Sequence, residues 1–182
     1  MDLVVVSGWT GAGKSTIADG LGVALSATVV SFDWVMSGLR SFPELWDVVE
    51  RPVDRQREIG WTLMSRVAEQ QLRRGGSVVL DLVARDQAIE RWRALAAEHG
   101  AALSVIECVC EDEQLHRARV EGRRRDIPGW YELTWEQVLR TRAGYVPLSV
   151  ADKLVLSAMQ PVETNLDAAL RYVTRGQALP KT

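Results

Sequence analysis

Residues 8–15 read Gly-Trp-Thr-Gly-Ala-Gly-Lys-Ser and follow directly on the apolar run Leu3–Ser7. They fit the pattern G-x-x-x-x-G-K-[ST] without a mismatch, and the residues that follow have the composition of a helix. Glycines allow successive backbone N–H groups to surround one anion, and the N-terminus of a helix adds positive partial charge. A strand, a glycine-rich loop and a helix in this order predict a binding loop for the phosphates of a nucleoside triphosphate. The alternative is a glycine-rich turn that binds nothing.

The residues of this phosphate loop, positions 8–16, have distinct expected roles. Only three of the 22 basic residues are lysines, and one of them, Lys14, lies where a compact ammonium can bridge the β- and γ-phosphates. The hydroxyl of Ser15 is expected to ligate Mg²⁺. ATP and Mg²⁺ are therefore the expected cofactors. The expected nucleotide-binding residues are Gly8, Thr10, Gly11, Ala12, Gly13, Lys14, Ser15 and Thr16.

Short valine-rich runs alternate with helical segments along the chain. The runs are apolar on both faces, which is typical of strands buried on both sides. This alternation predicts an α/β fold in which helices cover both faces of a parallel sheet. The expected strands are Leu3–Ser7, Thr28–Phe32, Ser77–Leu82, Leu103–Val109 and Lys153–Ser157. The expected helices are about Lys14–Ser26, Val53–Arg74, Arg85–His99, Glu111–Gly122, Thr134–Gly144 and Glu163–Arg175.

An acidic residue, Asp33, follows the second expected strand. Ligands of open parallel sheets bind beyond the carboxyl ends of the strands, so we expect Asp33 to face the same crevice as the phosphate loop. A carboxylate there can accept a proton from an attacking hydroxyl, or hold Mg²⁺ through water. The alternative is that Asp33 caps a helix that begins with the next residues. Arg40 is either a ligand for a substrate phosphate or carboxylate, or a solvated arginine.

The third expected strand also ends in an acid, Asp81, which is the usual place for a carboxylate that organises Mg²⁺. Asp86 is interpreted as the cap of the helix that follows it. Arg85 lies between these two acids and is expected to face the acceptor. The candidate substrate-binding residues are therefore Asp33, Arg40, Asp81 and Arg85, and the candidate metal ligands are Ser15 and Asp81.

An arginine-rich stretch follows the fourth expected strand and predicts a lid over the phosphates, at about residues 115–133. Arginines in such a lid would neutralise the charge on a transferring phosphoryl group. The alternative is a solvated basic helix. Arg119 and Arg123 lie four residues apart on one helical face, so they join Lys14 and Asp33 as candidate catalytic residues. The full cluster is Arg117, Arg119, Arg123, Arg124 and Arg125.

The seven tryptophans are numerous for a chain of 182 residues. Trp92 is interpreted as a core residue of an amphipathic helix. Trp34, Trp61 and Trp130 lie nearer the expected acceptor crevice and could stack on a ring, although core packing is the alternative for each of them.

Length and composition narrow the classes of protein. A chain of 182 residues is expected to form one domain, residues 1–182, with a frayed tail after position 175. A net charge of -2 argues against general nucleic-acid binding, and no apolar run approaches the length of a membrane span. Cys108 and Cys110 lack zinc spacing with either histidine, so buried thiols and a cytoplasmic location are expected.

These motifs together resemble the small P-loop kinases, a group that includes chloramphenicol phosphotransferase, polynucleotide kinase, gluconate kinase and the zeta toxins. The resemblance rests on the phosphate loop, VSFD at the second strand, VVLD at the third and the arginine-rich lid. Residues 80–95 are also similar to the segment after the third strand of chloramphenicol phosphotransferase. The resemblance implies a three-layer P-loop fold with strand order 2-3-1-4-5. It also implies transfer of the γ-phosphate of ATP to a hydroxyl, with the acid at position 33 as the base.

Three functions follow from these observations. The first is a kinase for a small hydroxylated molecule, acting as a monomer or a homodimer. The second is a nucleic-acid 5′-hydroxyl kinase, which the net charge of -2 disfavours. The third is a regulatory ATPase without an acceptor, which the acid at the second strand and the chain's own arginine lid disfavour. Residues 34–60 match no known acceptor signature, so the acceptor itself stays open.

Overall fold

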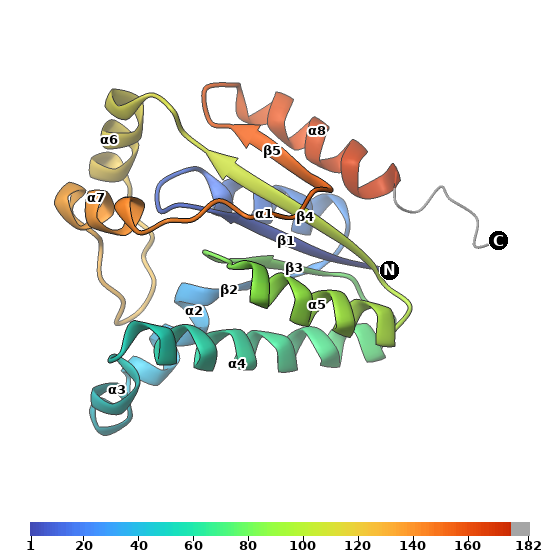
Figure 1. Cartoon of the computed structure of the whole chain (residues 1–182), viewed down its shortest axis with the longest axis horizontal. Helices are drawn as coiled ribbons and strands as arrows, with labels where there is room; N and C mark the ends of the chain where they lie inside the picture. The colour runs from blue at the N-terminus through green and yellow to red at the C-terminus, as the bar shows by residue number, and fades with distance from the viewer. Residues whose placement is uncertain (176–182) are drawn as a thin grey trace.

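The computed structural model describes residues 1–175, and the tail expected after position 175 lies outside the described residues. The described chain contains one sheet of five parallel strands in the order β2-β3-β1-β4-β5 (Figure 1). This order confirms the topology that the resemblance implies. The strands are β1 (Asp2–Gly8), β2 (Thr28–Ser31), β3 (Val78–Asp81), β4 (Ala102–Val109) and β5 (Lys153–Ser157).

Helices cover both faces of the sheet, because the strand side chains are apolar on both sides. Even-numbered residues of β1, such as Val4, pack with α1 (Lys14–Ala24) and α8 (Val162–Arg175) in one core cluster. Odd-numbered residues, such as Val5, pack with α4 (Val53–Arg73) and α5 (Asp86–Glu98) in the other. The expected fold with helices on both faces is confirmed. None of the helices within residues 1–175 is long and apolar enough to cross a membrane.

Four further helices lie toward the carboxyl ends of the strands (Figure 1). They are α2 (Phe32–Arg40), α3 (Pro43–Val49), α6 (Glu113–Gly122) and α7 (Trp135–Ala143). The first two were not among the expected helices. The second strand ends at Ser31 rather than Phe32, because Phe32 turns away to pack against Gly60 of α4. The start of α3 carries a recognisable signal, a proline at the first helical position.

The interpretation of Asp86 as a helix cap was wrong, and the alternative in which Asp33 caps a helix is also excluded. The N-cap residue of α5 is Arg85, and Asp86 lies in the first turn. The carboxylate of Asp86 instead accepts hydrogen bonds from the backbone N–H and the hydroxyl of Ser149, which hold the connection between α7 and β5. The N-cap residue of α2 is Ser31, so Asp33 also lies in a first turn and does not cap the helix.

Candidate active site

The phosphate loop joins the central strand β1 to α1, and its glycines are required by the backbone. Gly8, Gly11 and Gly13 have φ values of 132°, 84° and 87°, in the region that side chains disfavour. A Cβ atom at Gly8 would clash with the carbonyl oxygen of Cys108 on the neighbouring strand β4. Gly13 is the N-cap residue of α1, so the first N–H groups of this helix point into the loop. The loop therefore offers a ring of backbone donors to an anion.

The Lys14 side chain lies over the phosphate loop. Its Nζ atom donates a hydrogen bond to the carbonyl oxygen of Trp9 at 3.1 Å. Burial lowers the pKa of Lys14, while the nearby carboxylates of Asp81 and Asp33 oppose that shift. A desolvated ammonium fixed above a ring of N–H donors is suited to binding phosphate oxygens.

Ser15 and Asp81 meet at the end of the phosphate loop, as the sequence predicts for a metal site. The Ser15 hydroxyl donates to Oδ2 of Asp81 at 2.8 Å, and Asp81 is only 5% exposed. Burial raises the pKa of Asp81, while Lys14 and Ser15 oppose the shift. Hydroxyl and carboxylate oxygens are ligands that Mg²⁺ prefers, so this pair fits the ion. No group of three or more acidic, histidine or cysteine ligands occurs among the described residues.

Asp33 is held by an arginine of the lid segment (residues 115–133). Nη1 of Arg125 donates to Oδ2 of Asp33, and Nε of the same guanidinium donates to Glu132 at 3.1 Å. Nη2 donates to the carbonyl oxygen of Tyr131 at 2.7 Å. Arg125 is thus engaged by two carboxylates and a carbonyl, while Oδ1 of Asp33 accepts no hydrogen bond from the described residues.

Sequence reasoning did not single out Arg125, because it selected arginines by helical spacing and Arg125 lies beyond the end of α6. Helical spacing favoured Arg119 and Arg123, but the helix stops at Gly122 and Arg123 has extended backbone angles. The glycine was a usable stop signal, and beyond it a four-residue spacing no longer defines a face. No local pattern links Arg125 to Asp33, because 92 residues separate them in the chain.

The other arginines of the cluster divide between the cavities and the surface. Arg119 lines the cavity beside the phosphate loop, and Arg123 lines both that cavity and a second one. Two nitrogens of Arg123, Nε and Nη2, are buried without a hydrogen-bond partner among the described residues. Burial and the neighbouring Arg125 lower the pKa of Arg123, while Glu132 opposes the shift. Arg117 instead pairs with Glu121 on the exposed face of α6.

Of the cavities that adjoin the phosphate loop, two are lined by Lys14. The first, here called the nucleotide cavity, has a volume of about 350 Å³ and lies between residues 11–17 and the start of α8. The second, called the acceptor cavity, has a volume of about 220 Å³ and lies between the loop, α2, α4 and residues 130–146. Lys14, Ser15 and Arg123 line both cavities. Asp33, Asp81 and Arg85 line the acceptor cavity, so the structure brings these expected residues together.

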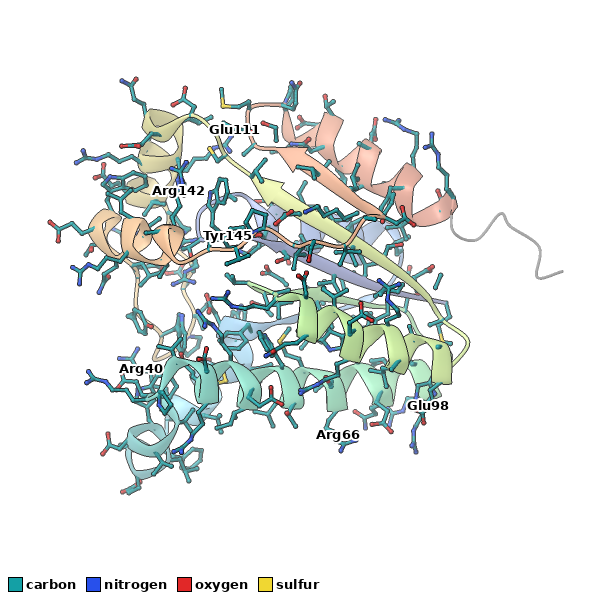
Figure 2. The ribbon with its side chains drawn as sticks, in the orientation of Figure 1. Arg40, Arg66, Glu98, Glu111, Arg142 and Tyr145 are labelled. Carbon is teal, nitrogen blue, oxygen red and sulfur yellow. The ribbon has the colours of Figure 1, made fainter. Side chains whose placement is uncertain are left out.

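Arg40 does not line the acceptor cavity. Its guanidinium lies 4.8 Å from the ring centre of Tyr131, 5.8 Å from Trp46 and 5.9 Å from Trp130. Figure 2 places Arg40 on the α2–α3 side of the molecule and Tyr145 on the α6–α7 side. Arg40 therefore packs against Trp130 and Tyr131, which line the cavity, and does not line the cavity itself.

The candidate stacking tryptophans occupy different environments. Trp61 of α4 and Trp92 of α5 are both buried in the same core cluster. Nε1 of Trp92 donates a hydrogen bond to the hydroxyl of Ser65 at 3.0 Å. Trp34 is exposed on the surface. Trp130 lines the acceptor cavity and stacks on Tyr131, with ring centres 5.1 Å apart. Of the three candidates, only Trp130 lines the acceptor cavity, whereas Trp34 lines a neighbouring one beside Asp33.

A buried histidine links the lid segment to the phosphate loop. The ring of His116, on α6, is fully buried, and its Nε2 lies 2.7 Å from the carbonyl oxygen of Thr10. Because a carbonyl only accepts, this contact requires the tautomer with the proton on Nε2. The ring also packs edge-on against Trp135, with centres 5.0 Å apart. Burial lowers the pKa of His116 and so favours the neutral ring.

A family comparison agrees with this geometry. The model of the AAA_33 family, described as an AAA domain, matches residues 3–148, which include the phosphate loop, Asp33, Asp81 and the lid segment. The chain belongs to this family. The match and the shared fold confirm the resemblance to the small P-loop kinases. Comparison with curated proteins gives no match.

Solved structures share the fold over nearly the whole chain. A sugar kinase from a Janibacter species has a TM-score of 0.67 at 17% identity, over 100% of this chain and 99% of its own. A gluconokinase from Sinorhizobium meliloti also has a TM-score of 0.67 at 17% identity, over 96% of this chain and 91% of its own. An APS kinase from Mycobacterium tuberculosis, in complex with AMPPNP and APS, has a TM-score of 0.59 at 18% identity, over 95% and 97%.

Proposed function

We propose that the protein is a single-domain, cytoplasmic kinase that transfers the γ-phosphate of ATP to a hydroxyl group of a small molecule. The observation that carries this proposal is the junction of the two cavities. Lys14, Ser15 and Arg123 line both, so a phosphoryl group held by them would face the acceptor cavity and Asp33. This junction gives a donor and an acceptor a shared boundary, which group transfer requires.

The nucleotide would bind through the phosphate loop and Lys14. Ser15 and Asp81 would hold Mg²⁺, which when bound neutralises charge on the phosphates. The backbone N–H groups around Gly11 and Gly13 would bind phosphate oxygens, and the ammonium of Lys14 would lie between the terminal phosphates.

The acceptor would bind with its hydroxyl near Asp33. Oδ1 of Asp33 accepts that hydrogen, while Arg125 holds Oδ2 and fixes the orientation of the carboxylate. The acceptor oxygen attacks the γ-phosphorus, the bond from this phosphorus to the bridging oxygen breaks, and ADP leaves. The hydroxyl proton passes to Asp33 and then to solvent. Nε of Arg123 lies 3.8 Å from Oε2 of Glu132, and the Nη2 group, which has no hydrogen-bond partner among the described residues, would stabilise charge on the phosphoryl oxygens together with Arg119.

The names of the solved structures with this fold support a small acceptor. Two are named as a sugar kinase and a gluconokinase, and a third was solved with AMPPNP and APS. An acceptor cavity of about 220 Å³ favours a compact molecule over a nucleic-acid strand.

The test is acceptor-dependent turnover. ADP release is measured with Mg²⁺ and ATP alone, and then with a library of hydroxylated metabolites and antibiotics, with mass spectrometry of the products. A kinase gives fast turnover and a phosphorylated product with an acceptor, and slow turnover without one. Equal ADP release in every mixture would instead indicate a regulatory ATPase. Phosphorylation of only a 5′-hydroxyl oligonucleotide would indicate the nucleic-acid kinase.

A further inference from the structure

The acceptor cavity has an apolar wall that the transfer chemistry does not need. Phe32 of α2, Val53 of α4, Val83, and Trp130, Leu133 and Val146 of the segment around α7 all line it. Apolar walls leave the hydroxyl groups of a polyol without partners, at a desolvation cost. An apolar group of the acceptor, such as a ring, would instead be stabilised there by burial.

This wall is held in place by contacts outside the cavity. Trp130 packs edge-on against Trp46 of α3, with ring centres 5.7 Å apart, and stacks on Tyr131. Arg40 lies against all three rings. These contacts limit the freedom of Trp130, so the wall is a preformed surface with a fixed shape.

Two of the five cations that line the acceptor cavity, Lys14 and Arg85, form no ion pair with the described residues, whereas the other three are paired with carboxylates. Nη2 of Arg85 donates a long hydrogen bond to the carbonyl oxygen of Gly144, at 3.4 Å. The adjacent carboxylate of Asp86 is engaged by Ser149. The cavity's own acids, Asp33 and Asp81, are engaged by Arg125 and Ser15.

The position of Arg85 separates it from the triphosphate. Lys14 and Arg123 line both cavities and Arg119 lines the nucleotide cavity, whereas Arg85 lines only the acceptor cavity. Arg57 also lines the acceptor cavity, but it pairs with Asp54 on the protein surface. Among the described residues, Arg85 is therefore the cation that lines only the acceptor cavity and has no carboxylate partner.

From the wall and this cation together we infer that the acceptor is a hydroxylated anion with an apolar body, and that Arg85 binds its carboxylate or phosphate group. A guanidinium can form two parallel hydrogen bonds with either anion. The inference rests on the proposed function, because it describes the acceptor of the same reaction. It names a narrower class than sugars or neutral alcohols.

The experiment compares matched acceptors that differ only in charge or body. Hydroxy acids with phenyl, alkyl and polyol bodies are paired with their amides, and binding to the whole protein loaded with AMPPNP is measured by calorimetry. We expect a hydroxy acid with an apolar body to bind at least tenfold more tightly than its amide, which is about 1.4 kcal/mol. The polyol acid is expected to bind more weakly than the apolar one.

Two variants assign the discrimination to a residue. Arg85→Gln should bind the acid and the amide equally, while Arg93→Gln, an exposed arginine on the same helix, should keep the wild-type preference. Equal binding of acids and amides by the wild type, no binding of any acid, or a preserved preference in Arg85→Gln would each overturn the inference. AMPPNP affinity checks that Arg85→Gln is folded.

Product analysis separates this inference from the proposed function. If neutral acceptors are phosphorylated as well as acids, the kinase stands and the acceptor class is wrong. If an acid binds through Arg85 but is never phosphorylated, the anion site at Arg85 stands and the kinase proposal is wrong.

Discussion

Arg125, in the loop after α6, donates a hydrogen bond to Asp33 in the first turn of α2, and so joins the lid segment to the acceptor side of the site. The guanidinium is 15% exposed and is held by Glu132 as well, so the two carboxylates share one cation. This arrangement fixes one oxygen of Asp33 and leaves the other available. It has direct consequences for variants of Asp33.

Asp33→Asn should slow phosphoryl transfer by about 10²–10⁴-fold, because the amide keeps the shape of the carboxylate but cannot accept a proton. Nucleotide affinity and thermal stability should stay close to wild type. Single-turnover transfer, AMPPNP binding and thermal unfolding measure the three quantities. Transfer at the wild-type rate in this variant would mean that Asp33 only anchors Arg125, and Asp81 would become the residue to examine.

Lys14→Ala and Lys14→Arg should both lose most triphosphate binding while keeping the fold. The alanine removes the ammonium, and the planar guanidinium is too large for the position above the loop where Nζ contacts the carbonyl of Trp9. Calorimetric titration with ATP and Mg²⁺ measures the loss. Near-normal activity of Lys14→Arg would contradict the role assigned to the ammonium.

Arg123→Ala should lower turnover more than it weakens nucleotide affinity, because Nη2 of Arg123 has no hydrogen-bond partner among the described residues and is available to the transferring group. Arg119→Ala is expected to have the same sign of effect. The matched control is Arg117→Ala, which removes a surface pair with Glu121 and should leave turnover unchanged. Steady-state kinetics with varied ATP separates the two effects, and equal losses in Arg123→Ala and Arg117→Ala would remove Arg123 from the mechanism.

His116 should make the stability of the protein depend on pH. Its pKa is lowered in the fold by burial, so the unfolded chain binds the proton more readily, and stability is lost as pH falls through the ordinary histidine range. His116→Gln keeps an N–H donor for the carbonyl of Thr10 but does not titrate. The unfolding temperature should therefore fall more steeply between pH 8 and pH 5 for the wild type than for this variant.

A second measurement tests the contact between His116 and the phosphate loop. His116→Ala should weaken ATP binding, because the carbonyl of Thr10 loses its partner, and His116→Gln should restore much of that affinity. An equal dependence of unfolding temperature on pH in the wild type and His116→Gln would contradict the first expectation. Equal ATP affinity in all three proteins would contradict the second.

The sequence predicted the parts of the site that follow from local pattern. The phosphate loop, the approximate position of α1 and the meeting of Ser15 with Asp81 all follow from a motif and from the carboxyl ends of neighbouring parallel strands. The family and the strand order were also predicted from these residues.

The rest depends on contacts between distant segments. The pairing of Arg125 with Asp33 and the contact of His116 with Thr10 cross 92 and 106 residues, and neither leaves a periodic signal. The function of Asp86 was misassigned for the same reason, because its partner Ser149 is far along the chain. The assigned roles of the site residues stay predictions for the experiments above.

The connection between β2 and β3 has an evolutionary consequence. Residues 32–57, which supply Asp33, Phe32 and Val53 to the acceptor cavity, extend from an edge strand, whereas the phosphate loop extends from the central strand β1. The segment can be lengthened, shortened or exchanged without changing the register of any strand pair around β1. Recognition of the acceptor can therefore diverge quickly among relatives while the chemistry of the phosphate stays the same.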